Sequence, residues 1–220
     1  MKFKAVIFDL DDTLYDEFTF VKQGYAAVAK YLSAQVHVPS DVIVTQMLAY
    51  YKQQGREQLF DFIINKYQWS GTVDVLLERY RAQQPSLVLY PDAAATLKQL
   101  KDQHVKVGVI TDGLNTVQKS KYRSLGLPQW VDQVIFTDDL GPGQHKPSTT
   151  SFEMICERLN IAYKASCYVG DNPVKDFLPA NQLGMTSVRL ARGMHKDREP
   201  VDKAHAPLFT IHRLEEVFTL

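Results

Sequence analysis

The sequence has no excess of charge of either sign. Its 25 Lys and Arg residues balance 25 Asp and Glu residues over 220 positions. Without a net positive field, a protein has little general attraction for a nucleic-acid backbone or an anionic membrane surface. We therefore expect no nucleic-acid or membrane partner, and any anion that binds must be met by local charges.

Long apolar runs and cysteines are also scarce. No run approaches the length of a membrane span, and the apolar stretch that begins at residue 5 is too short for the apolar part of a signal peptide. The two cysteines, Cys156 and Cys167, lack the paired spacing of a metal or redox site. We expect a cytoplasmic protein with core thiols, and 45% apolar residues suffice for a sizeable core.

Short apolar runs alternate with helical patterns along most of the chain. The runs that are typical of buried parallel strands cover 4–9, 105–111, 133–138, 166–171 and 186–190. This alternation predicts an α/β fold with a doubly wound parallel sheet, followed by a last strand near 208–211 and a terminal helix. In such sheets, ligands bind beyond the carboxyl ends of the strands.

One long segment breaks the alternation. Between the first strand and Pro91 lie about 75 residues without a strand pattern, which is too long for a connection. Apolar residues recur there at helical spacing in four segments. We predict a small helical domain at 15–89, inserted into a Rossmann-like core made of 1–14 and 90–220. Three cations are candidate substrate contacts or solvated charges of helix faces: Lys22, Lys52 and Arg56.

The end of the first strand is crowded with acids. Asp9, Asp11 and Asp12 follow the apolar run within four positions. Buried carboxylates repel one another, so each must take up a proton or meet a cation. A divalent metal site would account for the acids, and so would an exposed acidic turn. This segment alone leaves both interpretations open.

Further reactive side chains stand near later strand ends, in the order Thr111, Lys146, Asp171 and Asp176. This set suits phosphoryl transfer, because a carboxylate attacks phosphorus only where a metal and a cation screen the charge. Asp9 would be the nucleophile and Lys146 the cation. Magnesium accepts a few protein oxygens, which Asp9, the backbone carbonyl of Asp11 and Asp171 can supply.

The remaining groups have separate predicted roles. The Thr111 hydroxyl and the N–H groups of Asp112 and Gly113 would bind the phosphate oxygens. Asp11, two residues along the strand from the nucleophile, would protonate the leaving group and later accept a proton from water. Asp176 would orient Lys146 or a metal-bound water. The side chain of Asp112 should point away from the anion, because it adds negative charge.

The ordered set resembles the haloacid dehalogenase superfamily, in its phosphatase branch. The resemblance rests on the segments DLDDTL, VITDG, HKPS and VGDNPVKD. It spans about residues 3–192, and the inserted helices correspond to the family's C1 cap. It implies Mg²⁺-dependent hydrolysis of a small phosphorylated metabolite through an aspartyl phosphate. Two positions depart from the family pattern: Asp112 follows the Thr where Asn or a small residue often stands, and His145 precedes the Lys.

Other functions use related groups. A phosphomutase of the same superfamily would pass the phosphoryl group to a sugar hydroxyl, and the sequence leaves that alternative open. A phospho-accepting receiver module takes its phosphoryl group after the third strand and has no large insertion, so it fits less well. Halide displacement needs neither a metal nor a leaving-group acid, and Asp11 and Asp171 argue against it.

Overall fold

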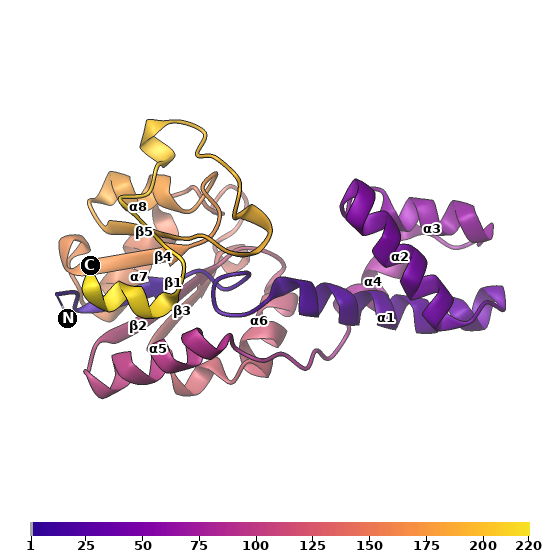
Figure 1. Cartoon of the computed structure of the whole chain (residues 1–220), viewed down its shortest axis with the longest axis horizontal. Coiled ribbons are helices and arrows are strands. Elements are labelled where there is room, and N and C mark those ends of the chain that lie inside the picture. Colours follow the sequence, from indigo (N-terminus) through magenta and orange to yellow (C-terminus); the bar gives the residue numbers. More distant parts are fainter. Residues whose placement is uncertain (1) are drawn as a thin grey trace. The chain divides into compact units, whose positions relative to one another are not determined.

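The computed structural model describes residues 2–220, which fall into two compact units (Figure 1). The core unit contains the chain up to Glu17 and from Leu87 to Leu220, and the helical unit is Phe18–Ser86. The insertion was expected at 15–89, so the bounds of the two units lie close to the expected ones.

A six-stranded sheet forms the centre of the core unit, in the order β3-β2-β1-β4-β5-β6 with every pair parallel. The predicted doubly wound α/β fold is confirmed. Phe8 of the central strand β1 lies beside Val109 of β2 and Val169 of β4, so these strands end at one edge. The strands are β1 (Ala5–Phe8), β2 (Lys106–Thr111), β3 (Gln133–Phe136), β4 (Ser166–Gly170), β5 (Thr186–Leu190) and β6 (Phe209–Ile211).

Helices cover this sheet with apolar faces. The core helices are α5 (Pro91–Asp102), α6 (Asn115–Ser124), α7 (Thr150–Leu159) and α8 (Phe177–Leu183). Phe152 and Ile155 of α7 join Ile7 in one buried cluster beneath the strands. Gly108 of β2 allows close packing there, because a Cβ at that position would lie 2.7 Å from Ile155 Cδ1. The expected terminal helix is a 3₁₀ helix, Leu214–Thr219.

The helical unit consists of four helices in the segments where helical spacing was seen. They are α1, which begins at the last residue of the core unit (Glu17–Val36), α2 (Ser40–Gln54), α3 (Leu59–Tyr67) and α4 (Val73–Arg81). Their interior is apolar and aromatic, with Leu32, Ile43, Met47 and Ile63 fully or almost fully buried. Helix propensity alone is weak in such short helices, so the packing of these side chains stabilises them.

Three hydrogen bonds hold the segments where the chain leaves and re-enters the core unit. The Tyr90 N–H donates to the Leu14 carbonyl at 2.9 Å. Asp12, with a positive φ of 54°, accepts from the N–H of Glu17 at 3.0 Å and from that of Met194 at 2.8 Å. The borders of the insertion are therefore held together by the core unit itself.

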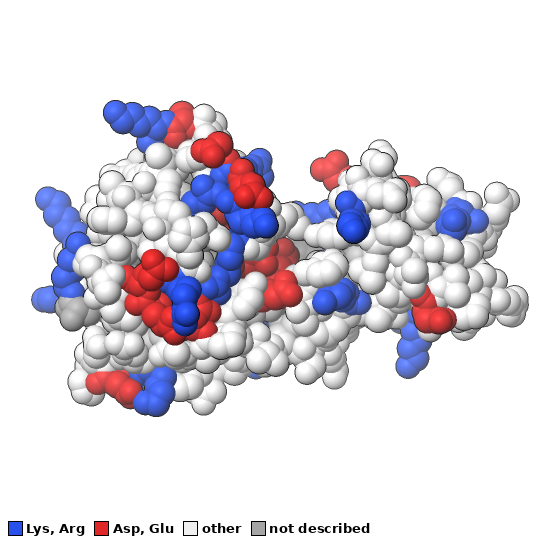
Figure 2. All heavy atoms as spheres, in the orientation of Figure 1, with Lys and Arg blue, Asp and Glu red and all other residues white. Residues whose placement is uncertain are grey.

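Charges of both signs share the surface. On the face shown in Figure 2, Lys and Arg side chains lie next to Asp and Glu side chains over the core unit, in keeping with the balanced composition. Among residues 2–220, the helices are too short or too polar to cross a bilayer.

Candidate active site

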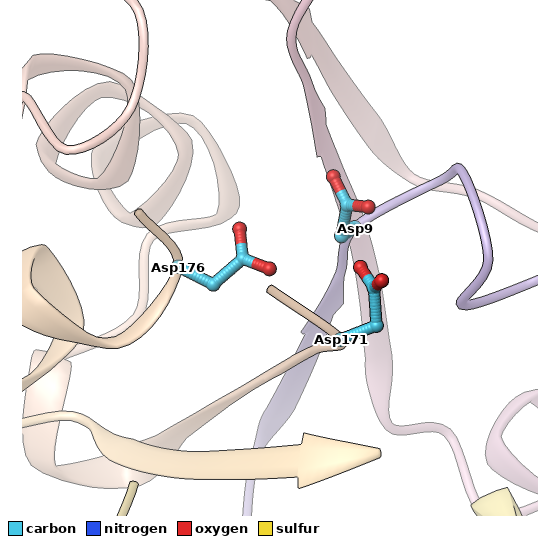
Figure 3. Close-up of side chains that lie close together, drawn as sticks. All are labelled: Asp9, Asp171 and Asp176. Atoms are coloured by element: carbon cyan, nitrogen blue, oxygen red, sulfur yellow. The ribbon is translucent and has the colours of Figure 1, made fainter. Parts of the chain in front are cut away.

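Three carboxylates meet where β1 and β4 end. Asp9 follows β1, Asp171 follows β4, and Asp176 stands just before α8. Figure 3 shows the three side chains turned toward a common point, and one oxygen of each lies within 4.8 Å of the others. All three residues are buried, so their mutual repulsion is poorly screened by water.

One buried cation serves two of these acids. The Lys146 Nζ lies 2.5 Å from Asp9 Oδ1 and 2.7 Å from Asp176 Oδ1, and it donates to the Tyr168 hydroxyl at 3.0 Å. Although burial alone would lower it, the charges of Asp176 and Asp9 hold the pKa of Lys146 well above its ordinary value. Lys146 is therefore a permanent positive charge beside Asp9.

The negative charge of the Asp171 carboxylate is less well compensated. The Asp171 Oδ2 atom is buried and has no hydrogen-bond partner among residues 2–220. Burial, together with Asp176 and Asp9, raises the pKa of Asp171 to about 9, and burial, opposed by Lys146, raises that of Asp9 to about 6. A partnerless carboxylate oxygen beside a second carboxylate suits a hard divalent cation with oxygen ligands, so these residues fit magnesium.

Asp176, by contrast, is fully engaged by the protein. Its Oδ1 accepts from Lys146 and from the Tyr168 hydroxyl, and its Oδ2 accepts from the Asn172 N–H at 2.9 Å. Gly170 makes room for it, because a Cβ there would lie 2.5 Å from Asp176 Oδ2. This arrangement suits an acid that orients Lys146, one of its two expected roles.

Asp11 lies in a different group of side chains from Asp9. Its Oδ1 accepts from the Tyr15 hydroxyl at 2.6 Å and the Lys121 Nζ at 2.7 Å, and its Oδ2 accepts from Gln118 Nε2 at 2.9 Å. Although burial opposes them, these donors lower the pKa of Asp11. The three-acid group contains Asp176 and not the Asp11 carboxylate, so of the predicted metal set only Asp9 and Asp171 contribute carboxylates to it.

The end of β2 supplies a hydroxyl and a tight turn. Thr111 is buried, and its Oγ1 accepts from Gln118 Nε2 at 2.5 Å. Gly113 has a φ of +118°, a conformation that side chains disfavour, and a Cβ there would contact the Gln118 side chain at 3.5 Å. Asp112 stands between them at the position where a strand gives way to the turn before α6.

The Asp112 side chain supports the Lys146 loop. Its Oδ1 accepts from the Thr137 hydroxyl at 2.8 Å and from the Lys146 N–H at 3.1 Å, while Oδ2 accepts from the Lys175 Nζ at 2.9 Å. Although burial opposes them, Lys146 and Lys175 lower the pKa of Asp112 to about 2. His145 Nδ1 also lies 2.9 Å from Thr137 Oγ1. The two departures from the family pattern, Asp112 and His145, thus meet at one threonine.

Sequence reasoning missed the partners that come from helices and loops. Tyr15, Gln118, Lys121 and Lys175 all contact predicted site residues, yet none was singled out. Gln118 and Lys121 stand three positions apart on α6, which places them on one helix face. Their spacing in the helix that follows the strand ending at Thr111 was the signal that could have identified them.

Comparison with known proteins gives one family. A sequence profile of the haloacid dehalogenase-like hydrolases matches residues 6–190. The chain is 31% identical to the glyceraldehyde 3-phosphate phosphatase of Methanocaldococcus jannaschii, over 97% of this chain and 95% of that protein. It is 28% identical to the ribulose-1,5-bisphosphate 5-phosphatase of Halopiger xanaduensis, over 91% and 90% of the two chains.

Solved structures agree with these sequence matches. The crystal structure of a HAD phosphatase from Thermococcus onnurineus superposes with a TM-score of 0.63 at 27% identity. The match covers all of this chain and 97% of that one. The likeness therefore includes the residues of both units.

Proposed function

The chain belongs to the haloacid dehalogenase-like hydrolases, in their phosphatase branch, and from that premise we propose that it hydrolyses a small phosphorylated metabolite with the help of magnesium. The observation that carries this proposal is the partnerless Asp171 oxygen beside Asp9, with Lys146 2.5 Å from the same Asp9 side chain. A nucleophilic carboxylate, a cation and an open ligand oxygen are the parts that phosphoryl transfer from an ester requires.

In the proposed reaction, one Asp9 oxygen attacks phosphorus and the bond to the leaving oxygen breaks. The leaving oxygen takes a proton from Asp11, which gives the alcohol and an aspartyl phosphate. Water then attacks this phosphorus, loses a proton to Asp11, and inorganic phosphate leaves while Asp9 is restored. The donors around Asp11 favour its ionised form, which the second step needs and which opposes the first, where Asp11 must carry the proton that it donates.

The other residues bind the phosphoryl group and the ion. Lys146, the Thr111 hydroxyl and the N–H groups of Asp112 and Gly113 would contact the phosphate oxygens, where charge grows during transfer. Asp9, Asp171 and the backbone carbonyl of Asp11 would hold magnesium, and Asp176 would orient Lys146. When bound, magnesium screens the charges that otherwise keep carboxylate and phosphate apart.

The substrate class follows from the relatives. Both named relatives act on small phosphorylated sugars: one on glyceraldehyde 3-phosphate and the other on ribulose 1,5-bisphosphate. We propose a substrate of that size and class. We further propose that the helical unit, Phe18–Ser86, is the family's cap and sets the choice among such substrates, as caps and lids do in many enzymes.

Hydrolysis of an aryl phosphate by the purified protein tests the proposal. Magnesium should support release of inorganic phosphate, and exhaustive chelation should abolish it. Calcium should compete with magnesium without replacing it, because calcium readily takes both oxygens of a carboxylate and would occupy the attacking atom. Full activity after chelation, or equal turnover with calcium alone, contradicts the proposal.

A panel of sugar phosphates then identifies the substrate. Glyceraldehyde 3-phosphate and ribulose 1,5-bisphosphate are the first compounds to assay. Measuring both inorganic phosphate and phosphorylated sugar separates hydrolysis from transfer to another hydroxyl. Isomerised sugar phosphate without free phosphate would identify a phosphomutase instead.

A further inference from the structure

Helix α6 carries two polar side chains that the proposed reaction does not use. Gln118 and Lys121 are both buried, with 2% and 3% of their surfaces exposed. Burying a lysine and an amide is costly unless their polar atoms are bound, and both reach toward the site. We call these two residues the α6 clamp.

Gln118 bridges two site residues that come from different strands. Its Nε2 group donates to Thr111 Oγ1 at 2.5 Å and to Asp11 Oδ2 at 2.9 Å. The nitrogen must face these partners, because an ionised carboxylate only accepts hydrogen bonds. One amide group therefore sets the distance between the Thr111 hydroxyl and the Asp11 carboxylate.

The bridge also orients the Thr111 proton. A hydroxyl has one proton to donate and two lone pairs that accept. Since Gln118 donates to Thr111 Oγ1, the Thr111 proton must point away from Gln118, and we infer that it can be donated to a ligand oxygen.

Lys121 fixes the other oxygen of the same acid. Its Nζ lies 2.7 Å from Asp11 Oδ1 and 3.7 Å from Glu17 Oε1. Tyr15 donates to Asp11 Oδ1 as well, so both oxygens of the carboxylate are held. Rotation of the Asp11 side chain would break at least one of these bonds.

Helix α6 is itself anchored at its first turn. The Asn115 N–H donates to Asp138 Oδ2 at 2.8 Å, and Lys119 pairs with Asp139 at 3.2 Å. The turn before the helix contains Gly113, which has a φ of +118° and lies next to the Gln118 side chain. The clamp is therefore carried by a helix that is tied to the segment after β3.

We propose that the α6 clamp positions the acid–base residue Asp11 and the phosphate-binding Thr111 relative to each other. Gln118 and Lys121 are positioning residues that act through Asp11 and Thr111 and do not touch the substrate. This inference rests on the proposed phosphatase function and adds residues to that same site.

Gln118→Met tests the proposal, because it keeps the length of the side chain and removes the amide. Without the bridge, Asp11 aligns less well with the leaving oxygen, which matters for alkyl phosphates and little for aryl phosphates. We expect the ratio of kcat/KM for an alkyl phosphate to that for an aryl phosphate to fall about tenfold. A partly unfolded variant would lose both activities equally and leave the ratio unchanged.

Phosphate binding gives a second measurement. Calorimetric titration with inorganic phosphate should show about three- to tenfold weaker binding to Gln118→Met, because the Thr111 proton is no longer oriented. Arg123→Met, at an exposed position of the same helix, is the matched control and should alter neither quantity. If Gln118→Met does not fold, the smaller Gln118→Ser replaces it in both measurements.

Lys121 provides an independent arm of the test. Lys121→Met should lower the alkyl-to-aryl ratio, and Lys121→Arg should restore most of it. If the wild-type protein is active and the Gln118 variants keep the wild-type ratio and phosphate affinity, the proposed role of the α6 clamp is contradicted. The proposed phosphatase function is then unaffected. If the wild-type protein hydrolyses no phosphate ester, both proposals fail.

Discussion

The two units of the molecule bury different kinds of side chain. Among residues 2–220, all buried polar and charged side chains lie in the core unit, including Asp9, Lys146 and Asp176. The buried side chains of Phe18–Ser86 are apolar or aromatic. Burying charge costs stability unless the charges are paired, whereas burying apolar surface provides it. The buried charges of the core unit therefore lower its stability relative to an apolar interior, and the helical unit has no such cost.

The sharpest way to break this comparison is to neutralise the proposed nucleophile. Asp9→Asn should lower phosphatase activity by at least about a thousandfold, because a covalent nucleophile has no substitute. The melting temperature should change little. Burial raises the pKa of Asp9 to about 6, so the folded state disfavours the ionised carboxylate, and the uncharged amide avoids that cost. Substantial turnover by this variant would show that Asp9 is not the nucleophile. Asp61→Asn, on the exposed face of α3, should leave activity unchanged.

Removing the buried cation should harm both function and stability. Lys146→Met leaves the carboxylates of Asp9 and Asp176 without their shared partner, and breaking such a pair costs about 3–5 kcal/mol. Urea denaturation would measure the loss. Lys98→Met, in an exposed pair with Asp102, should cost less than about 1 kcal/mol. Equal costs at the two lysines would contradict the contrast between buried and exposed charge.

A cavity in the helical unit should affect that unit alone. Met47 is fully buried, so Met47→Ala should lower the free energy of unfolding of this unit by about 2–5 kcal/mol. Differential scanning calorimetry would follow its transition, and the magnesium requirement of the enzyme should stay as in the wild type. Val42→Ala, at a 40% exposed position of the same helix, is the control. A changed metal requirement would place part of the ion site in the helical unit.

The smallest effect is expected at a charge pair of the core unit away from the site. The carboxylate of Asp92 accepts from both terminal nitrogens of Arg192 and from the Leu214 N–H. Although burial opposes them, these donors hold the pKa of Asp92 below its ordinary value. Asp92→Asn should cost about 1–3 kcal/mol at neutral pH.

The pH dependence of that cost follows from the sign of the shift. A lowered folded-state pKa stabilises the protein above the unfolded value of about 3.9 and ceases to do so as the pH falls through the folded value. The difference between wild type and Asp92→Asn should therefore shrink below about pH 4. Asp102→Asn, at the other end of α5, should show a smaller difference. A difference that grows with acidity would contradict the pairing.

The sheet and the helices could be predicted because their formation depends on the pattern of apolar and polar residues along short segments of the sequence. The run that ends at Phe8 is apolar throughout, and the strand it forms is buried throughout. The same patterns placed Asp9, Thr111 and Asp171 at strand ends, since parallel strands end at one edge. The 3₁₀ form of Leu214–Thr219 was missed, because its apolar spacing also suits an α-helix.

The contacts of the site could not be predicted in the same way. Which helix residue turns toward Asp11 depends on how α6 is rotated against the sheet, and that rotation is set by distant contacts such as Asn115 with Asp138. Asp112 was expected to point away from the anion because of its charge. Its side chain accepts from Thr137, Lys146 and Lys175, a set of partners from three separate segments.

The hydrogen bond from the Tyr90 N–H to the Leu14 carbonyl bears on how much the insertion can vary in length. It joins the two chain segments on either side of Phe18–Ser86, so the strands on both sides keep their places whatever lies between. The entropy cost of closing such a loop rises by only about 0.6 kcal/mol for each doubling of its length. A change in the length of the inserted segment should therefore cost little free energy and leave the acids at the strand ends in place.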